Sequence, residues 1–292
     1  MRAGATDPLS RNNTKSNSPK SNQRRGNAIM RALLLALFAA LAVAPAPAQQ
    51  PFVTDDTDVT EQGQFHFEFS NSFDLLQPES FPNLKQNTAS FELAYGLLKH
   101  VEVSIETPLI TIFNAREASS RTAFGIGDTN LSIKYNFLPE REGSRLPALT
   151  VSGSIELPTG DTKSGLGSGV ADYSLNGVMQ KTLTARTKLR LNGGVIFSGN
   201  TVTGAIGIRN ARGTVFTGGA SIVRDFTDKL ALGVEVTGAQ TRNFDLGKGQ
   251  LQAQIGGNYA LRENLTLDFG FTAGRYSASP RLGAQLGISV DF

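Results

Sequence analysis

The sequence contains no cysteine and no tryptophan, and only two of its 292 residues are histidines. Without cysteine, a chain has no disulfide framework, no thiolate metal site and no thiol nucleophile. The sequence also lacks an apolar run of the roughly 18 residues that a membrane-spanning helix requires. These absences exclude cysteine chemistry and leave β-strands as the elements that would carry this chain across a membrane.

The charged residues are unevenly distributed along the chain. The formal net charge is +3, but residues 1–31 hold seven Lys or Arg against one Asp, so the residues after them are net acidic. No basic stripe with interleaved aromatic residues is present in that acidic part. We therefore expect no nucleic-acid partner.

An apolar Leu/Ala stretch at residues 32–43 follows Arg31 and precedes the small residues of 46–48. A basic start, a short apolar core and an A-x-A site are the parts of a secretory signal peptide, in that order. We expect a signal peptide at residues 30–48, cleaved between Ala48 and Gln49. An uncleaved anchor is the alternative.

The remaining chain divides around this signal. Residues 1–29 form a polar extension, and Met30 would start a signal peptide of ordinary length. We expect residues 49–61 to be a short periplasmic segment and residues 62–292 to be a β-barrel domain.

Apolar residues after Gln62 recur at every second position, as Phe65, Phe67 and Phe69 do. This period is typical of strands with two different faces. The pattern predicts an all-β, transmembrane, antiparallel, up-and-down β-barrel of about 12 strands, an even number. The expected strands lie near residues 65–70, 91–95, 101–106, 131–137, 149–157, 173–179, 189–197, 215–223, 230–237, 251–259, 265–273 and 282–292.

Tight and long connections alternate between these strands. Short turns are expected at 98–100, 184–186, 227–229 and 262–264, and longer loops at 77–85, 114–122, 158–169, 199–213 and 241–249. Outer-membrane barrels have short periplasmic turns and longer outer loops, so both termini should face the periplasm. The loop 158–169 either folds inward as a constriction or stays solvated with Asp161 and Lys163 as its charged tip.

One face of the expected strands is almost uncharged, whereas the other carries the charges. The predicted lumen-lining residues are Glu102, Glu106, Asp128, Lys134, Glu156, Lys188, Arg190, Glu235 and Asp268. Closing the sheet on itself would turn the apolar face to lipid and give every strand a hydrogen-bonding partner. A soluble secreted sandwich is the alternative for strands of period two.

The carboxyl end alternates apolar residues from Leu282 and finishes on Phe292. This ending resembles the assembly signal of outer-membrane barrels, which implies outer-membrane lipid and the barrel assembly machinery as partners.

Candidate chemistry is limited to histidine. A barrel lipid hydrolase would need a Ser activated by His, and His66 is the histidine on the polar face, whereas His100 falls in a periplasmic turn. The His-Asp-Ser-Asn-Gly motif of outer-membrane phospholipases is missing. We therefore expect no enzyme activity and no cofactor, and keep the hydrolase as the less favoured alternative.

Four short motifs carry a family resemblance: Gly125-Ile126-Gly127-Asp128, which leads into Leu131-Ser132-Ile133-Lys134-Tyr135, then the run Glu156-Leu157-Pro158-Thr159-Gly160-Asp161, and residues 165–169. Together they resemble the outer-membrane proteins named for the meta-pathway of phenol degradation, most closely between Phe124 and Leu183. The resemblance implies a transporter-like barrel without catalytic residues.

We therefore expect a bacterial outer-membrane channel for passive passage of small solutes, aromatic or otherwise apolar ones among them. A structural or adhesive barrel without solute flux is the alternative.

Overall fold

The computed structural model describes residues 51–80, 83–114, 122–141, 143–198, 213–241 and 249–292. The chain divides into two units, residues 1–42 and 43–292, and every described residue belongs to the second. The predicted signal peptide and its cleavage site at Ala48 and Gln49 lie outside the described residues.

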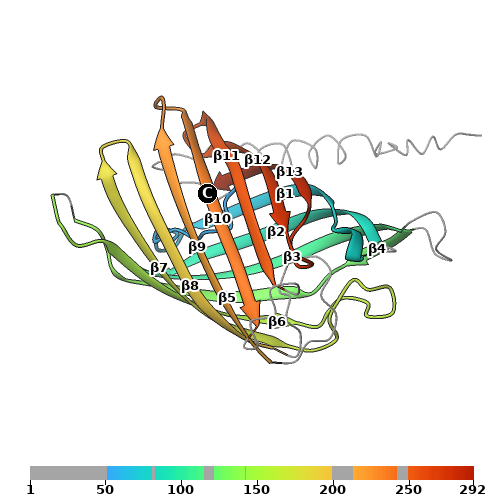
Figure 1. Ribbon diagram of the computed structural model, residues 1–292. Helices are drawn as coiled ribbons and strands as arrows, with labels where there is room; N and C mark the ends of the chain where they lie inside the picture. The colour runs from blue at the N-terminus through green and yellow to red at the C-terminus, as the bar shows by residue number, and fades with distance from the viewer. Residues whose placement is uncertain (1–50, 81–82, 115–121, 142, 199–212, 242–248) are drawn as a thin grey trace, which may run out of the picture. The chain divides into compact units, whose positions relative to one another are not determined.

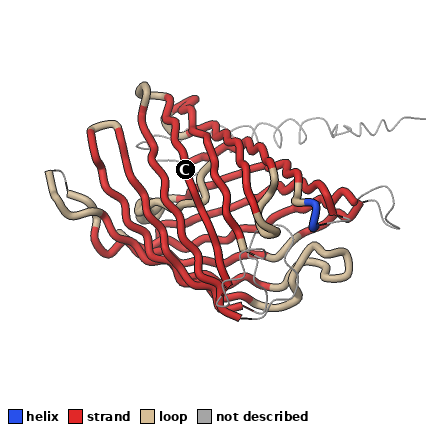
Figure 2. The backbone as a smooth tube through the Cα atoms, viewed as in Figure 1, coloured by secondary structure: helices blue, strands red, loops and turns tan. Residues whose placement is uncertain are grey.

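Strands make up most of the described chain (Figure 2). The first six strands are β1 (Phe65–Leu75), β2 (Asn83–Leu98), β3 (Val101–Asn114), β4 (Thr122–Ile126), β5 (Thr129–Leu138) and β6 (Ala148–Leu157). The other seven are β7 (Asp172–Thr184), β8 (Thr187–Ser198), β9 (Gly213–Asp225), β10 (Leu230–Thr241), β11 (Gln250–Arg262), β12 (Leu265–Arg275) and β13 (Leu282–Asp291). Within the described ranges, no helix has the length and apolar character needed to cross a bilayer.

The strands form one closed antiparallel ring (Figure 1). Sequential neighbours pair from β5 to β13, β13 pairs with β1, and the pairing of β2 with β3 closes the ring. All twelve predicted strand segments are strands. The ring therefore confirms the up-and-down barrel and leaves no long unpaired edge.

One strand position is divided in two, which the sequence did not predict. β3 pairs with β5 along Val101–Glu106 and with β4 along Leu109–Phe113, so β4 and β5 share one of twelve positions. Pro108 of β3 lies at the break and has no N–H to donate to a ladder. The strand is interrupted at Gly127 and Asp128 instead of continuing.

The two faces of the ring differ as predicted. Apolar side chains on the outer face are strongly exposed, with Phe124 at 66 % and Phe271 at 64 %, whereas Lys134 is 5 % and Glu235 is 2 % exposed. In β9, the even-numbered residues from Phe216 to Arg224 are exposed, and the odd-numbered residues between them are half-buried or buried. An apolar outer belt of this kind suits hydrocarbon.

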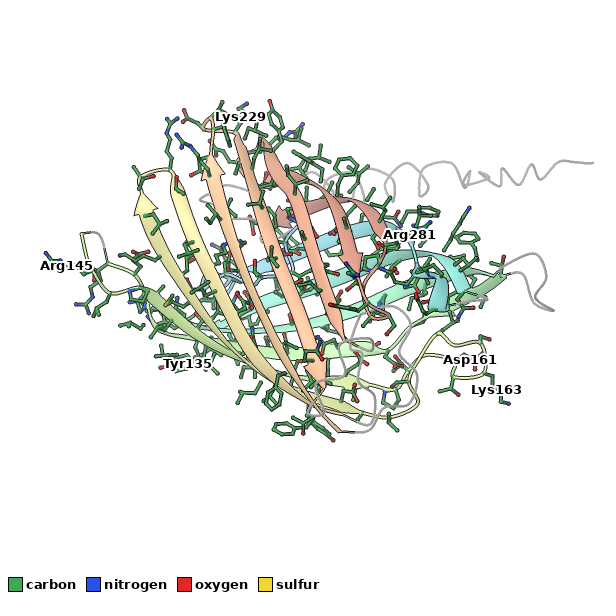
Figure 3. The ribbon with its side chains drawn as sticks, in the orientation of Figure 1. Tyr135, Arg145, Asp161, Lys163, Lys229 and Arg281 are labelled. Carbon is green, nitrogen blue, oxygen red and sulfur yellow. The ribbon has the colours of Figure 1, made fainter. Side chains whose placement is uncertain are left out.

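The two ends of the ring carry different connections. Arg145 and Lys229 lie at the end with the short turns, and Asp161 and Lys163 lie at the tip of a loop at the opposite end (Figure 3). At the short-turn end, the rings of Phe65 and Phe292 stack with their centroids 5.7 Å apart. Both chain ends of the barrel thus meet where the predicted periplasmic turns lie.

Candidate functional site in the barrel interior

The segment before β1 lies inside the ring. The sequence led us to expect residues 49–61 as a short periplasmic segment. The described part instead contacts inward-facing side chains along an arc of the ring that extends from Gln254 of β11 to Glu102 of β3. We call residues 51–60 the inner segment. It lies across the lumen because its backbone and side-chain groups find partners on the polar face of the wall.

Two wall carboxylates hold the backbone of the inner segment. Glu235 accepts hydrogen bonds from the N–H groups of Val53 (3.0 Å) and Thr54 (2.5 Å). Glu102 accepts from both the N–H and the hydroxyl of Thr60, each at 2.7 Å. Each of these two predicted lumen residues accepts two hydrogen bonds from the segment, which fixes it near both of its ends.

Wall cations hold the acidic middle of the segment. Lys134 Nζ lies 2.8 Å from Asp55 Oδ1 and 3.2 Å from Asp56 Oδ1. The guanidinium of Arg190 donates to the other oxygen of Asp56 at 3.3 Å. The three lumen cations, which we call the basic cluster, are Lys134, Lys188 and Arg190. Their partners come from the inner segment, a pairing that strand periodicity alone did not predict.

The two aspartates respond differently to this environment. Burial alone would raise the pKa of Asp56, but the charges of Lys134 and Arg190 outweigh it and hold that pKa below 3.8. Burial is also the largest influence on Asp55, and its pKa is raised in spite of Lys134. Asp56 is therefore the carboxylate that the wall cations keep ionised.

The inner segment leaves the lumen through a tight passage at Gly96. The N–H of Gly63 donates to the carbonyl of Gly96 at 2.8 Å, and Gly63 has a positive φ of 86°. A Cβ at Gly96 would lie 2.0 Å from the carbonyl oxygen of Glu61. Only glycine permits this close approach, which positions the turn from the inner segment into β1.

A different stretch of wall is acidic. Glu68 of β1 pairs in register with Glu92 of β2, and Glu92 pairs with Glu106 of β3. Side chains at such positions have Cβ atoms about 4.5–5.5 Å apart. We call these three residues the acidic wall. Opposite charges face each other in register at Glu102 and Lys134, whereas Glu106 faces Glu92 and Asn130.

His66 connects the acidic wall to the last strand. Its Nδ1 lies 2.6 Å from Asp291 and its Nε2 lies 2.9 Å from Glu68. Both ring nitrogens therefore contact carboxylates, one on β1 itself and one on its partner strand β13. A general base for a serine nucleophile needs a ring nitrogen directed at that serine, so this geometry supports a structural role for His66.

At the end of the ring opposite the short turns, the motifs of the family resemblance form a set of hydrogen bonds between Asp128 and the loop 158–169. The carboxylate of Asp128, at the break between β4 and β5, accepts from the N–H of Gly160 at 2.9 Å and of Ser168 at 2.6 Å. We call this arrangement the loop clasp. A Cβ at Gly167 would lie 2.5 Å from Asp128 Oδ1, so glycine lets the loop approach the carboxylate.

The two parts of the loop 158–169 differ in exposure. Its tip, with Asp161 and Lys163, is exposed. Its Leu166 is 5 % exposed, and the Cδ1 atom lies where a Cβ of Gly125 would point, 2.9 Å away, on the inner side of β4. The loop is thus solvated at the tip and folded inward at Leu166.

Three further predicted lumen residues are Asp268, Glu156 and Lys188. Asp268 is fully buried and accepts from Ser289 at 2.7 Å. Glu156 faces Asn130 and Asp172 in register. Lys188 lies 3.9 Å from Asp58, at the edge of the basic cluster. Within the described residues, no three His, Asp or Glu side chains converge as metal ligands would.

Sequence reasoning missed the position of the inner segment and two of the three residues of the acidic wall. The run Thr54-Asp55-Asp56-Thr57-Asp58 is the signal that could have indicated the former, because its charge complements a lumen that carries Lys and Arg. Glu68 and Glu92 also alternate with apolar residues, but their position opposite each other depends on the register between strands.

Comparison with known proteins identifies related sequences and folds. The model of the family described as "Putative MetA-pathway of phenol degradation" matches residues 53–292. No curated protein is matched by the sequence.

Three solved structures share the fold at low sequence identity. An outer membrane channel from Pseudomonas putida F1 is 15 % identical, with a TM-score of 0.60, covering 83 % of this chain and 99 % of that chain. The KdgM porin in complex with disordered oligogalacturonate is 12 % identical, with a TM-score of 0.51 and coverage of 78 % and 99 %. The NanC porin is 8 % identical, with a TM-score of 0.52 and coverage of 77 % and 98 %. All three are outer-membrane-type barrels.

Proposed function

This chain belongs to the family described as Putative MetA-pathway of phenol degradation, and we propose that it is an outer-membrane channel for passive passage of small solutes. The observation that carries the proposal is the division of its two faces. Apolar side chains cover the outside of a closed ring, while charged groups such as Glu235 and Lys134 are enclosed. Such a ring suits lipid outside and a polar path inside.

The interior fits a narrow path for solutes that has apolar stretches in its lining. Twelve strand positions give a lumen between those of eight-stranded barrels and general porins, and the inner segment occupies part of it. Ile196 of β8 and Val215 of β9 are register partners, both buried among the polar inward residues. This supports small aromatic or otherwise apolar solutes over large hydrophilic ones.

The proposal includes the cellular setting. In this setting, the signal peptide directs export, the barrel assembly machinery recognises the Phe292 end, and the barrel inserts into the outer membrane. We do not propose an enzyme activity. The proteins of similar fold are a channel and a porin by name, and both ring nitrogens of His66 contact carboxylates.

Planar bilayers test the channel directly. The purified mature chain should give discrete conductance steps, and the same preparation after boiling should give none. A structural or adhesive barrel would instead remain silent at every protein concentration while still migrating differently when boiled and unboiled on a detergent gel. A folded but silent protein contradicts the proposal.

A further inference from the structure

The basic cluster binds carboxylates that do not belong to the barrel wall. Lys134 and Arg190 are 5 % and 4 % exposed, and their carboxylate contacts within 4 Å are to Asp55 and Asp56. In the wall itself, the register partners of Arg190 are Gln180 and Ser221, neither of which is charged. The inner segment therefore supplies the anionic groups that buried cations require.

The wall alone does not replace these anions. Lys134 faces one wall carboxylate in register, Glu102, and that carboxylate accepts two hydrogen bonds from Thr60. When the inner segment leaves the lumen, Lys134 and Arg190 become cations that face water without their two aspartates. A cationic pocket of this kind attracts any small carboxylate that can enter.

An apolar seat adjoins the basic cluster. Phe52 is buried, and its Cζ lies 2.8 Å from where a Cβ of Gly233 would be, so the missing side chain of Gly233 makes room for the ring. Gly233 pairs in register with Val223, and Val223 pairs with Lys188 of the basic cluster. The inner segment thus presents an aromatic ring and carboxylates to neighbouring parts of the wall.

We propose that the basic cluster, together with the seat at Gly233 and Val223, is a binding site for a small solute that carries a carboxylate on an apolar ring. The inner segment occupies this site with its own ring and carboxylates when solute is absent. Entry of such a solute competes with the segment and frees the lumen. The inference rests on the proposed channel function for its physiological use, and the binding site itself is measurable without conduction.

Removing the internal competitor tests the site. In the variant Asp55→Asn/Asp56→Asn, the cations remain while both carboxylates are lost, so benzoate should bind about tenfold more tightly to the detergent-solubilised barrel than it does to wild type. Benzyl alcohol, which keeps the ring without the charge, should show no such gain. Acetate, which keeps the charge without the ring, should gain less than benzoate.

A second variant shows whether the gain belongs to the cations. Adding Lys134→Gln and Arg190→Gln to the first variant should abolish the gain for benzoate. If the aspartate variant does not fold, as judged by its gel migration before and after boiling, a chain lacking residues 51–60 provides the same uncovered site. Unchanged benzoate affinity in a folded variant, or an equal gain for benzyl alcohol, would overturn the inference.

The two proposals fail in different ways. Tighter benzoate binding by a barrel that is silent in bilayers would contradict the channel and leave the site standing. Discrete conductance from a barrel that shows no benzoate gain would contradict the site and leave the channel standing.

Discussion

Two parts of the lumen wall differ in how their charges are compensated. The basic cluster, on β5 and β8, meets an acidic stretch of chain that is not part of the wall. The acidic wall, on β1–β3, places Glu68, Glu92 and Glu106 next to one another, and the ring of His66 contacts Glu68. The inner segment therefore compensates the charge of the basic cluster, whereas it contains no Lys or Arg that could compensate the acidic wall.

This comparison predicts that the inner segment limits the flow of ions through the lumen more than the acidic wall does. Deleting residues 51–60 should raise the single-channel conductance roughly threefold or more, because the segment crosses the lumen between β11 and β3. Single-channel recording in planar bilayers measures this change. An unchanged conductance in a deletion variant that still forms a heat-modifiable barrel would show that the constriction lies elsewhere.

The acidic wall should determine ion preference. In Glu92→Gln/Glu106→Gln, loss of two lumen carboxylates should lower the cation-to-anion permeability ratio about two- to threefold. The reversal potential across a salt gradient reports this ratio. Glu263→Gln is the matched control, since Glu263 is exposed in the turn between β11 and β12, and it should leave the reversal potential unchanged. Equal effects of the two changes would contradict a role for the acidic wall.

Loss of the loop clasp should change the order of the loop 158–169 more than it changes the conductance. Asp128→Ala removes the acceptor of two backbone N–H groups, at a cost of about 2–3 kcal/mol to the docked loop. Lys163 at the exposed tip is a trypsin site, so cleavage there should accelerate by roughly tenfold or more. Asp228→Asn, at an exposed turn of the opposite end, is the control. Cleavage at an unchanged rate in Asp128→Ala would mean that the clasp does not hold the loop.

Local periodicity predicted most of the barrel. Alternation along one strand is visible without knowledge of its neighbours, which is why the strand segments and the charged face agree with the structure. The break at Gly127 and Asp128 was not predicted, because β4 has only five residues and its interruption depends on Pro108 of the partner strand. The alternation within β9 was weak, since glycines and small residues stand at several of its positions.

The inner segment could not be predicted in the same way. Lys134 lies 79 residues from Asp55, and Arg190 lies 134 residues from Asp56. Pairs at such separations are set by closure of the ring, which brings distant strands around one lumen. A run of aspartates before the first strand indicates charge, but not that the charge enters the barrel.

The most direct test of this account is a reversible covalent link between the inner segment and the wall. The hydroxyls of Thr54 and Ser221 are 2.7 Å apart, and the chain has no native cysteine, so Thr54→Cys/Ser221→Cys should form a single disulfide on oxidation. Thr54→Cys/Phe216→Cys, with the second cysteine on the outer face of β9, should form none. We predict that the linked protein gives the lowest conductance and that a reductant restores it. A disulfide that forms without changing conductance, or a pair that never links in the folded barrel, would contradict an inner segment that lies across the lumen and limits flow.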